Sequence, residues 1–337
     1  MSSIDCVVIW VDGADPEWRK SKNNYLDCVS KITNDDGEER YRDLGTLKYL
    51  FRGIETNMPW VRNVYFVTCG QIPDWMNTNN PKLRLVEHKD FIPSEYLPTF
   101  SSHPIELNLH RIKDLSDGFV YFNDDMFVIR ETKETDFFNG GLPCDTAVFN
   151  AIAMEKTEKE FRFLMPINDI EIINKHFKKS DCIKKNWSKY FNLKYGKDLI
   201  RTICLNPWVH FTGFYNYHFP YSITKKVLRE LWEKEPEVLD RTCSHRFRDS
   251  NDVNIWLASY WQYATGCFSP RSPRIGHLTC VSDDQENNKA VYNHIRTKRS
   301  KLLVINDTIE KADSNAISKE LIGAFESILP NKSSFEK

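Results

Sequence analysis

The chain has 337 residues, of which 41% are hydrophobic and 28% charged, a composition that favours a folded globular protein over a disordered one. The 46 Lys and Arg residues nearly balance the 47 Asp and Glu residues, so the net charge of −1 provides no global attraction for nucleic acid. Nine cysteines without a C-x-x-C pair predict reduced thiols and no zinc framework. Because the sequence has neither a signal-peptide pattern nor an apolar run of roughly 18 residues, we expect a cytoplasmic protein.

Predicted strands and helices alternate along the first third of the chain. Apolar runs at 4–11, 63–70 and 82–88 predict three strands, the first two buried on both faces. Between the first two, residues 20–42 are polar and predict an exposed excursion, and Asp43 is a candidate cap for the helix that follows. This order of elements is typical of an α/β sheet.

The second half of the chain is expected to add helices to this sheet. Residues 150–200 are lysine-rich and amphipathic, which indicates a helical insertion, and 222–236 and 250–264 predict two more helices. The apolar run at 301–307 predicts a late strand. An apolar stripe at 317–328 predicts a final helix, either packed on the body of the protein or attached peripherally to a membrane.

The segment FVYFNDDMFVIR at 119–130 places Asn123, Asp124 and Asp125 within a run that otherwise predicts one buried strand. Ligands of open α/β sheets gather at the carboxyl ends of strands. Two adjacent carboxylates at such a place require a positive partner, such as Mg²⁺ held together with substrate phosphates. The alternative is an ordinary hairpin turn with solvated aspartates.

The segment SSHPIELNLHRI at 101–112 begins a predicted helix at 104–115. His103, Glu106 and His110 fall at i, i+3 and i+7, so they share one face of that helix. Imidazole and carboxylate groups in this arrangement suit acid–base catalysis or zinc binding. A solvated helix face that carries the same residues is the alternative.

Two later segments carry further candidates. His218 lies among aromatic residues in NYHFPYS at 216–222, where a histidine is expected to titrate near neutrality or below, which suits acid–base work. More often, such a histidine is a satisfied core residue. In HRFRDSND at 245–252, two arginines precede Asp249 and Asp252. Arginine suits bidentate phosphate contacts, whereas helix capping and surface ion pairs are the simpler explanation of this segment.

The order of these segments resembles the Stealth family. The resemblance rests on IDCVVIWVDGADPEW, RYRDLGTLKYLFRGIETNMPWVRNVYFVTCGQIPDWMN, LPTFSSHPIELNLHRI…FVYFNDDMFV, HFPYSITKKVL…FRDSNDVN and KLLVINDT. These cover most of 4–130, 205–265 and 301–310. The family includes bacterial capsule and exopolysaccharide sugar-phosphate transferases, and the catalytic part of the animal enzyme that places N-acetylglucosamine-phosphate on lysosomal glycoproteins.

The resemblance implies both a fold and a reaction. The fold would be α/β, with a mixed, mostly parallel nucleotide-binding sheet similar to the type A glycosyltransferase fold and with a helical insertion. The enzyme would transfer a sugar-1-phosphate from a UDP-sugar to a glycan hydroxyl with Mg²⁺ or Mn²⁺, forming a phosphodiester and releasing UMP. The acceptor would be a lipid-linked or polymeric glycan, at the inner face of the cell membrane, in capsule or exopolysaccharide synthesis.

Four regions follow from this reading of the chain. They are a nucleotide-sugar-binding half with strand-end acids at 1–135, a mostly helical insertion at 136–204, the remainder of the catalytic domain at 205–310 and a C-terminal amphipathic helix at 311–337.

The resemblance assigns the nucleotide pocket to the first two motifs. Trp10 and Asp12 would contact uracil or ribose, and Gly13 would let the chain approach the nucleotide closely. Arg42 and Asp43 match the start of the second motif, where Arg42 would contact a phosphate.

The resemblance also assigns essential residues. Glu106 and Asp125 match essential acids, and His218, Arg248 and Asp252 match an essential histidine, arginine and acid. The chain departs from the animal enzymes immediately after the arginine, where they have a histidine, so no catalytic role is expected there.

The reaction requires a cation, a charge-stabilising group and a base. We expect Asp125 to bind Mg²⁺ with help from Asp124 or Asp252, while the metal and an arginine stabilise phosphoryl charge. His218 is the first candidate for the general base, followed by Glu106 or Asp125.

Three other functions are consistent with parts of the pattern. A metal-dependent glycosyltransferase would use the same acids but release UDP. A zinc hydrolase would use His103, Glu106 and His110. A binding module without activity would leave the ionisable groups at strand and helix ends unexplained.

Overall fold

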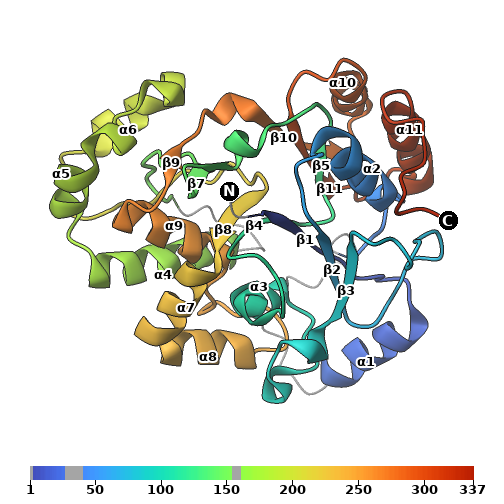
Figure 1. Cartoon of the computed structure of the whole chain (residues 1–337), viewed down its shortest axis with the longest axis horizontal. Coiled ribbons are helices and arrows are strands. Elements are labelled where there is room, and N and C mark those ends of the chain that lie inside the picture. Colours follow the sequence, from blue (N-terminus) through green and yellow to red (C-terminus); the bar gives the residue numbers. More distant parts are fainter. Residues whose placement is uncertain (1–2, 27–40, 154–160) are drawn as a thin grey trace.

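The computed structural model describes residues 3–26, 41–153 and 161–337 and centres on a five-stranded sheet (Figure 1). The strand order is β3-β2-β1-β4-β8, in which the first four strands are parallel and β8 is antiparallel to β4. The expected mixed, mostly parallel α/β sheet is therefore confirmed. The strands are β1 (Asp5–Ile9), β2 (Val64–Thr68), β3 (Leu83–Glu87), β4 (Gly118–Phe122) and β8 (Tyr221–Thr224).

Two smaller sheets flank the main one. In the first, with the order β10-β11-β5, the strand β11 is parallel to β10 and antiparallel to β5. In the second, with the order β6-β7-β9, all strands are short. Their strands are β10 (Gly276–Ser282), β11 (Leu302–Thr308), β5 (Met126–Val128), β6 (Phe138–Asn139), β7 (Leu142–Asp145) and β9 (Ser269–Pro270).

The segment 119–130 is not the single strand that its apolar residues predict. Its first part is β4 in the main sheet, and its second part is β5 in another sheet. Asn123, Asp124 and Asp125 form the link between the two strands. The acids therefore interrupt no ladder, because the chain leaves one sheet and joins the next at this point.

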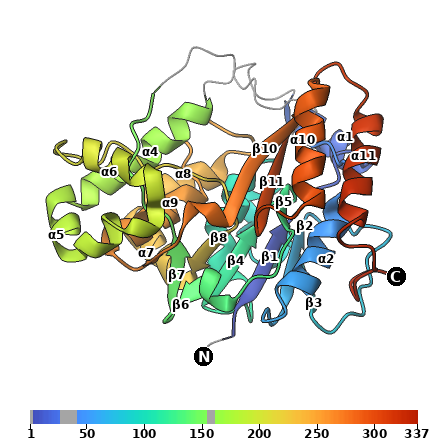
Figure 2. The same cartoon turned by 90° about the horizontal axis from the view of Figure 1, so that it is seen from above.

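Helices surround the sheets on several sides. In Figures 1 and 2, α5 and α6 lie at the left end and α10 and α11 at the right end, with the main sheet between them. The helices are α1 (Pro16–Leu26), α2 (Leu47–Asn57), α3 (Ser102–Asn108), α4 (Phe161–His176), α5 (Lys179–Tyr190), α6 (Leu199–Leu205), α7 (Lys225–Lys234), α8 (Pro236–Ser244), α9 (Ile255–Thr265), α10 (Gln285–Arg296) and α11 (Ser314–Glu326).

Two expectations about the N-terminal part change in detail. The predicted excursion at 20–42 begins inside α1. The Asp15 side chain caps this helix by accepting from the Glu17 N–H at 2.9 Å. Residues 27–40 of the excursion lie outside the described residues. Asp43 does not cap α2, because that helix begins at Leu47 and the Asp43 carboxylate accepts from the Gly45 N–H.

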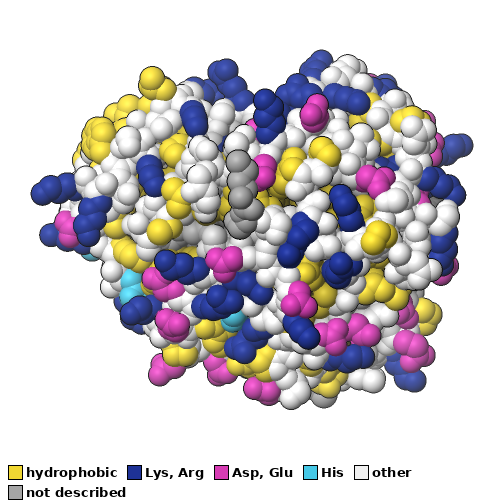
Figure 3. Space-filling model, viewed as in Figure 1, with side chains coloured by type: hydrophobic (Ala, Val, Ile, Leu, Met, Phe, Trp, Pro, Cys, Tyr) yellow, Lys and Arg dark blue, Asp and Glu magenta, His cyan; other side chains and the backbone are white. Residues whose placement is uncertain are grey.

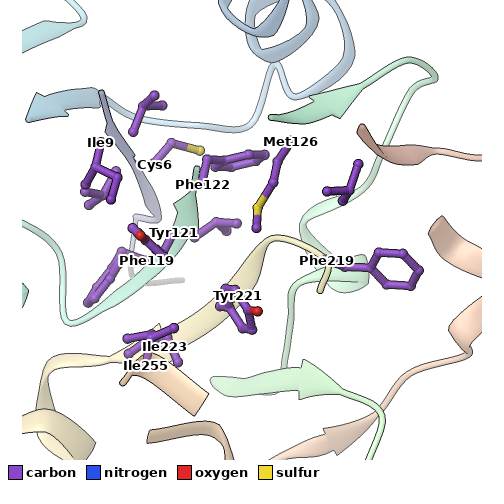
Figure 4. Close-up of a cluster of buried hydrophobic side chains, with 14 of the residues drawn as sticks. Cys6, Ile9, Phe119, Tyr121, Phe122, Met126, Phe219, Tyr221, Ile223 and Ile255 are labelled. Atoms are coloured by element: carbon purple, nitrogen blue, oxygen red, sulfur yellow. The ribbon is translucent and has the colours of Figure 1, made fainter. Parts of the chain in front are cut away.

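The core is built from the buried faces of the central strands. Cys6, Phe122, Met126 and Ile223 come from β1, β4, β5 and β8 but belong to one buried core, part of which is drawn in Figure 4. All five residues of β1 are buried. This explains the continuous apolar run at 4–11, since a central strand in a covered sheet meets protein on both faces.

The C-terminal stripe packs on the protein. Ile317, Leu321 and Phe325 of α11 are buried, and the Phe325 ring lies 4.5 Å from the Phe127 ring, centroid to centroid. The stripe is therefore not available at the surface for a membrane contact. Within the described residues, no helix combines the length and apolar character needed to cross a bilayer.

Candidate active site

A cavity of about 650 Å³ lies at the carboxyl ends of β1 and β4. It collects most of the residues that the sequence marked as functional. Asp12, Gly13 and Asp252 do not line it. The predicted residues that do are Trp10, Arg42, Asp43, His103, Glu106, Asp124, Asp125, His218 and Arg248.

Strand direction explains why residues far apart in sequence meet here. Because β1 and β4 are parallel neighbours, Trp10 and the Asp124–Asp125 link follow them at the same edge of the sheet. Strand β8 runs the other way, and Tyr221 at its start pairs with Tyr121 near the end of β4. The residues just before β8, including His218, therefore reach the same edge.

The Asp124–Asp125 link carries excess negative charge. The Asp125 backbone oxygen accepts from the Ile305 N–H at 3.0 Å, which fixes the link, but the side-chain Oδ1 is buried without a hydrogen-bond partner. The Asp124 side chain is exposed to the cavity. Desolvation by the surrounding protein, and then the negative charges of Asp125 and Asp43, nevertheless raise the pKa of its carboxyl to about 7. Both observations indicate that a positive charge is needed at this point.

A divalent cation fits that requirement. A diphosphate would be repelled by the side chains of the described lining, where carboxylates outnumber guanidinium groups. Mg²⁺ and Mn²⁺ prefer carboxylate oxygens and commonly share them with substrate phosphates. Asp124 and Asp125 are the side chains that would hold the ion. The lining carboxylates are Asp43, Glu106, Asp124, Asp125 and Asp307, and the lining guanidiniums are Arg42 and Arg248.

His218 faces the acid link and is held by neighbouring side chains. Its Nε2 lies 3.9 Å from Asp125 Oδ2, and its Nδ1 lies 3.0 Å from the Tyr221 hydroxyl. Its φ of 54° is unusual for a residue other than glycine, and its N–H donates to Asn216 Oδ1 at 2.7 Å, which supports this conformation. The Tyr221 oxygen also accepts from Trp256 Nε1 at 2.7 Å. The imidazole is therefore presented to the cavity in a fixed orientation.

Glu106 joins three elements at the cavity wall. Its Oε1 accepts from the Tyr121 hydroxyl at 3.0 Å, and its Oε2 accepts from the Ile255 N–H at 3.1 Å, at the first residue of α9. A helix N-terminus favours a negative charge at this position. Because both oxygens already accept hydrogen bonds, the carboxylate is better suited to holding α3, β4 and α9 together than to removing a proton.

Asp252 is buried behind the cavity wall. Its carboxylate accepts from His103 Nδ1 at 3.0 Å, from His245 Nδ1 at 2.7 Å and from the Asp249 N–H at 3.0 Å. Burial alone would raise the pKa of Asp252, but the hydrogen bonds from the two histidines outweigh it, and the pKa is lowered. This aspartate is fully engaged with protein donors.

The expected metal ligands do not all assemble. In the described part of the chain, the carboxylate of Asp252 does not form a cluster of possible metal ligands with Asp124 and Asp125. It clusters instead with His245 and Asp249, whose ligand atoms lie within 4.8 Å of one another and of Asp252. The intervening protein explains this, because Asp252 points to its histidines rather than to the cavity. The metal assignment therefore reduces to the two link aspartates.

The zinc arrangement expected on α3 does not form either. His103 binds Asp252, whereas burial, and then the charge of Arg111, lower the pKa of His110 to about 4. Within the described residues, His103, Glu106 and His110 do not form a metal-binding group. This arrangement gives no support to a zinc hydrolase.

The two arginines lie at the cavity with protein contacts of their own. Arg42 Nη1 lies 3.1 Å from Asp307 Oδ2 and 3.3 Å from the Ile309 oxygen. Arg248 Nη2 lies 3.4 Å from Ser102 Oγ. Both arginines line the cavity, where their guanidinium groups can contact an anionic substrate.

The first predicted nucleotide motif is divided between cavity and turn. The Trp10 ring lines the cavity and stacks on Phe66, with their centroids 5.7 Å apart. Asp12 instead shapes the turn, because its Oδ1 accepts from the Ala14 N–H at 2.8 Å. A Cβ on Gly13 would lie 2.2 Å from the backbone carbonyl oxygen of Tyr41. Glycine is therefore needed here, because the backbone at Tyr41 packs directly against this position.

Several participants were not identified from the sequence. Tyr221 and Trp256 orient His218, Tyr121 holds Glu106, and Asp307 pairs with Arg42. In the sequence, the two tyrosines could not be distinguished from core aromatic residues, so the contacts of their hydroxyl groups could not be inferred. Asp307 lies in the KLLVINDT motif, whose position at the end of an apolar run was the available signal.

Known proteins match this chain over its whole length. Residues 40–144 match the family model "Stealth protein CR2, conserved region 2", and residues 217–265 match "Stealth protein CR3, conserved region 3". The capsular polysaccharide phosphotransferase WcwK of Streptococcus pneumoniae is 42% identical over 100% of this chain and 99% of its own. The exopolysaccharide phosphotransferase cps2G of Lactiplantibacillus plantarum is 39% identical over 99% and 96%, respectively.

A further relative and one solved structure complete the comparison. The receptor polysaccharide phosphotransferase WefC of Streptococcus oralis is 37% identical over 100% of both chains. The crystal structure of the galactosyltransferase LgtC with donor and acceptor sugar analogs covers 96% of both chains at 10% identity, with a TM-score of 0.40. The resemblance noted in the sequence is confirmed by the family models and by these relatives. The chain therefore belongs to the Stealth family and is a phosphotransferase enzyme.

Proposed function

We propose that this enzyme transfers a sugar-1-phosphate from a UDP-sugar to a glycan hydroxyl, forming a phosphodiester and releasing UMP, in capsule or exopolysaccharide synthesis. The names of the relatives support polysaccharide phosphotransfer. The observation that carries the proposal is the juxtaposition of the Asp124–Asp125 link with His218. An unneutralised acid pair and an oriented imidazole are what metal-assisted phosphoryl transfer requires.

The donor would lie along the cavity with its diphosphate beside the acid link. We assign Asp124 and Asp125 as holders of a Mg²⁺ or Mn²⁺ ion. Such an ion, when bound, offsets phosphoryl charge and orients the diphosphate. Arg248 and Arg42 provide fixed positive charge at the same cavity, and Trp10 offers a ring face for the base of the nucleotide.

His218 is assigned as the general base. Its Nε2 would take the proton of the acceptor hydroxyl as that oxygen attacks the β-phosphorus of the donor. The new bond joins the acceptor oxygen to phosphorus, and the bond between that phosphorus and the bridging oxygen breaks, so UMP leaves with the electron pair. Since the oxygens of Glu106 both accept hydrogen bonds and Asp125 is assigned to the metal, His218 is the best placed of the three candidates.

The cellular setting is proposed on the same grounds. The acceptor would be a lipid-linked or polymeric glycan at the inner face of the cell membrane, reached from the cytoplasm. The eight described cysteines are all free thiols, which supports a reducing compartment. Regions 1–135 and 205–310 would form the catalytic domain together, since the main sheet takes β8 from the second and its other strands from the first.

The products of a single assay test the reaction. A panel of UDP-sugars is incubated with the purified enzyme, Mg²⁺ and a glycan acceptor, and UMP and UDP are quantified separately. We expect UMP, together with a phosphodiester signal in the ³¹P spectrum of the product. Release of UDP with no phosphodiester would identify a metal-dependent glycosyltransferase and overturn the proposal.

A further inference from the structure

Exposed hydrophobic side chains are concentrated in one part of the molecule. Among the described residues, eleven large hydrophobic side chains are exposed, and six of them lie between positions 187 and 209. Figure 3 shows hydrophobic side chains gathered at the upper left, over α6. A concentration of this kind marks an interaction site more often than a random feature of the surface. The six are Trp187, Leu193, Ile200, Ile203, Trp208 and Val209, which we call the α5–α6 surface.

The backbone under this surface is held firmly. Lys179 at the start of α5 is buried, and its Nζ donates to the carbonyl oxygens of Leu205 and Trp208 at 2.7 and 2.9 Å. On α6, the buried Thr202 hydroxyl accepts from the Phe149 N–H at 3.1 Å, which ties that helix to the body. The apolar side chains are therefore presented by ordered structure rather than by a loose segment.

The same segment is strongly basic. Residues 178–209 contain eight Lys and Arg side chains and two Asp side chains, a net charge of +6 with histidine neutral, whereas the whole chain has −1. Exposed Lys184, Lys185 and Lys197 lie on α5 and before α6. Apolar residues that include tryptophan, combined with lysines, are the pattern of surfaces that lie in the headgroup region of an anionic bilayer.

We propose that the α5–α6 surface binds the interface of an anionic lipid bilayer, with the side chains of α6 entering the headgroup region. Charge complementarity favours an anionic bilayer as the partner, because this segment is positively charged although the whole chain is slightly negative. The stripe on α11 cannot serve the purpose, since it is buried. Binding to lipid does not depend on the proposed reaction and can be measured without any nucleotide-sugar.

The position of this surface suits a membrane-bound acceptor, a consequence that does rest on the proposed function. Val209 on the surface and His218 in the cavity are nine residues apart in the chain. A chain of that length spans at most about 32 Å. A lipid-linked glycan of a few sugar units anchored beside α6 could therefore reach His218, the proposed general base.

Vesicle sedimentation tests the proposal with the full chain. We expect the protein to sediment with vesicles of phosphatidylglycerol and phosphatidylcholine in equal parts, and to bind about tenfold or more weakly to pure phosphatidylcholine or at high salt. The double variant Ile200→Ser/Ile203→Ser and the triple variant Lys184→Glu/Lys185→Glu/Lys197→Glu should each lose about tenfold or more of this binding.

A matched control removes exposed apolar side chains elsewhere. Ile72 and Leu85 are exposed after β2 and on β3, at the far side of the main sheet from α6, so Ile72→Ser/Leu85→Ser should bind vesicles like the wild type. Circular dichroism checks that each variant is folded. Equal vesicle binding by all variants would overturn the proposal, and so would self-association through the α5–α6 surface in sedimentation velocity without vesicle binding. Neither outcome would alter the expected release of UMP.

Discussion

Asp125 and Asp252 each have a histidine neighbour, but the two aspartates differ in how closely they approach it. Asp252 Oδ1 lies 2.7 Å from His245 Nδ1, and its Oδ2 lies 3.0 Å from His103 Nδ1. Asp125 Oδ2 lies 3.9 Å from His218 Nε2, too far for a hydrogen bond, and its Oδ1 has no partner. One carboxylate is saturated, and the other has room for a ligand.

This difference separates two roles that the sequence could not distinguish. From the resemblance, both aspartates were expected to be essential acids, and both were predicted to bind the metal. A carboxylate whose oxygens are filled by protein donors stabilises the fold, and its pKa is lowered, as for Asp252. An acid pair that lines the cavity is available to a cation. Desolvation, and then repulsion from the neighbouring acids, raises the pKa of Asp124 beside Asp125.

The largest expected effect comes from replacing the acid in the link. Asp125→Asn should reduce transfer by about 10³-fold, because it removes a charge from the position assigned to the metal and the diphosphate. The midpoint of urea unfolding should change little, since the Asp125 Oδ1 makes no hydrogen bond that could be lost. Initial rates of UMP release and urea titrations of the same preparations provide the two measurements.

The matching variant in the other aspartate sharpens this result. Asp252→Asn makes the same substitution at the saturated site. The division of roles would be confirmed if Asp125→Asn lost activity without losing stability and Asp252→Asn lost stability. If Asp125→Asn retained more than about a tenth of the wild-type rate, an essential charge at the link would be ruled out.

Asp252→Ala should have the next largest effect, on stability rather than on chemistry. It leaves two buried or half-buried histidines and one N–H without their acceptor, which should reduce the free energy of unfolding by about 3 kcal/mol. Urea unfolding measures this loss. A variant of unchanged stability with impaired metal binding would show instead that Asp252 acts as a ligand.

The pH dependence of that loss follows from two pKa shifts. The lowered pKa of Asp252 stabilises the fold above the unfolded value of 3.8 and ceases to do so as the pH falls through the folded value. The hydrogen bond that His245 donates to Asp252 raises the pKa of His245, which contributes stability below 6.5 that disappears as the pH rises through the folded value. The effect of Asp252→Ala should therefore be greatest between about pH 4 and 6.5.

The fold was predictable where strands are buried on both faces. The runs at 4–11, 63–70 and 301–307 became β1, β2 and β11, because a covered strand needs continuous apolar residues. Strand β10, by contrast, is largely exposed or half-buried, so GHLTCVS gave no strand pattern. Helix α1 has no buried residues and was missed for the same reason.

The site was predictable as a set of residues but not as a set of contacts. The resemblance identified Asp125 and His218, and the structure places both at the cavity. The partners of Asp252 could not be inferred, because His103 is 149 positions away and its alignment with Asp252 depends on how α3 packs against the segment before α9. Saturation of a carboxylate is a tertiary property, so the sequence left its role open.

The unusual pKa of Asp124 predicts a pH-dependent metal affinity. Because the carboxylate must be ionised to bind Mg²⁺, affinity should fall up to about tenfold per pH unit below pH 7, where the raised pKa of Asp124 keeps it protonated. Titration calorimetry at pH 6, 7 and 8 measures this. Asp124→Asn should bind the ion more weakly and lose the pH dependence, whereas an unchanged pH profile would place the proton elsewhere.

The same shift has a consequence for stability without metal. A folded-state pKa above the unfolded value of 3.8 means that the folded protein is penalised as the pH rises toward 7. Asp124→Asn should therefore stabilise the metal-free protein at pH 8 by on the order of 1 kcal/mol, since solvent in the cavity reduces both the desolvation penalty and the repulsion. The gain should vanish near pH 4, the opposite trend to that of a saturated aspartate.

The smallest expected effect concerns the orientation of His218. Tyr221 is neutral, because burial raises its pKa, and its oxygen accepts from Trp256 Nε1 at 2.7 Å while lying 3.0 Å from His218 Nδ1. When Nδ1 carries the proton and donates to this oxygen, Nε2 is left bare toward the cavity, as a base requires. Tyr221→Phe should therefore lower kcat by about tenfold, less than the 10²–10⁴-fold expected for His218→Ala.

A positioning role makes a further prediction that simple loss of packing does not. In Tyr221→Phe, the ¹⁵N chemical shifts of His218 should report a mixture of tautomers, and the acidic limb of the kcat–pH profile should move, while the KM for the UDP-sugar stays within about twofold. Tyr215→Phe, a change in an exposed tyrosine of the same segment, should behave like the wild type. If Tyr221→Phe lost activity with an unaltered tautomer and pH profile, then the 3.0 Å contact would serve packing alone, and His218 would owe its orientation to Asn216 and to its strained backbone.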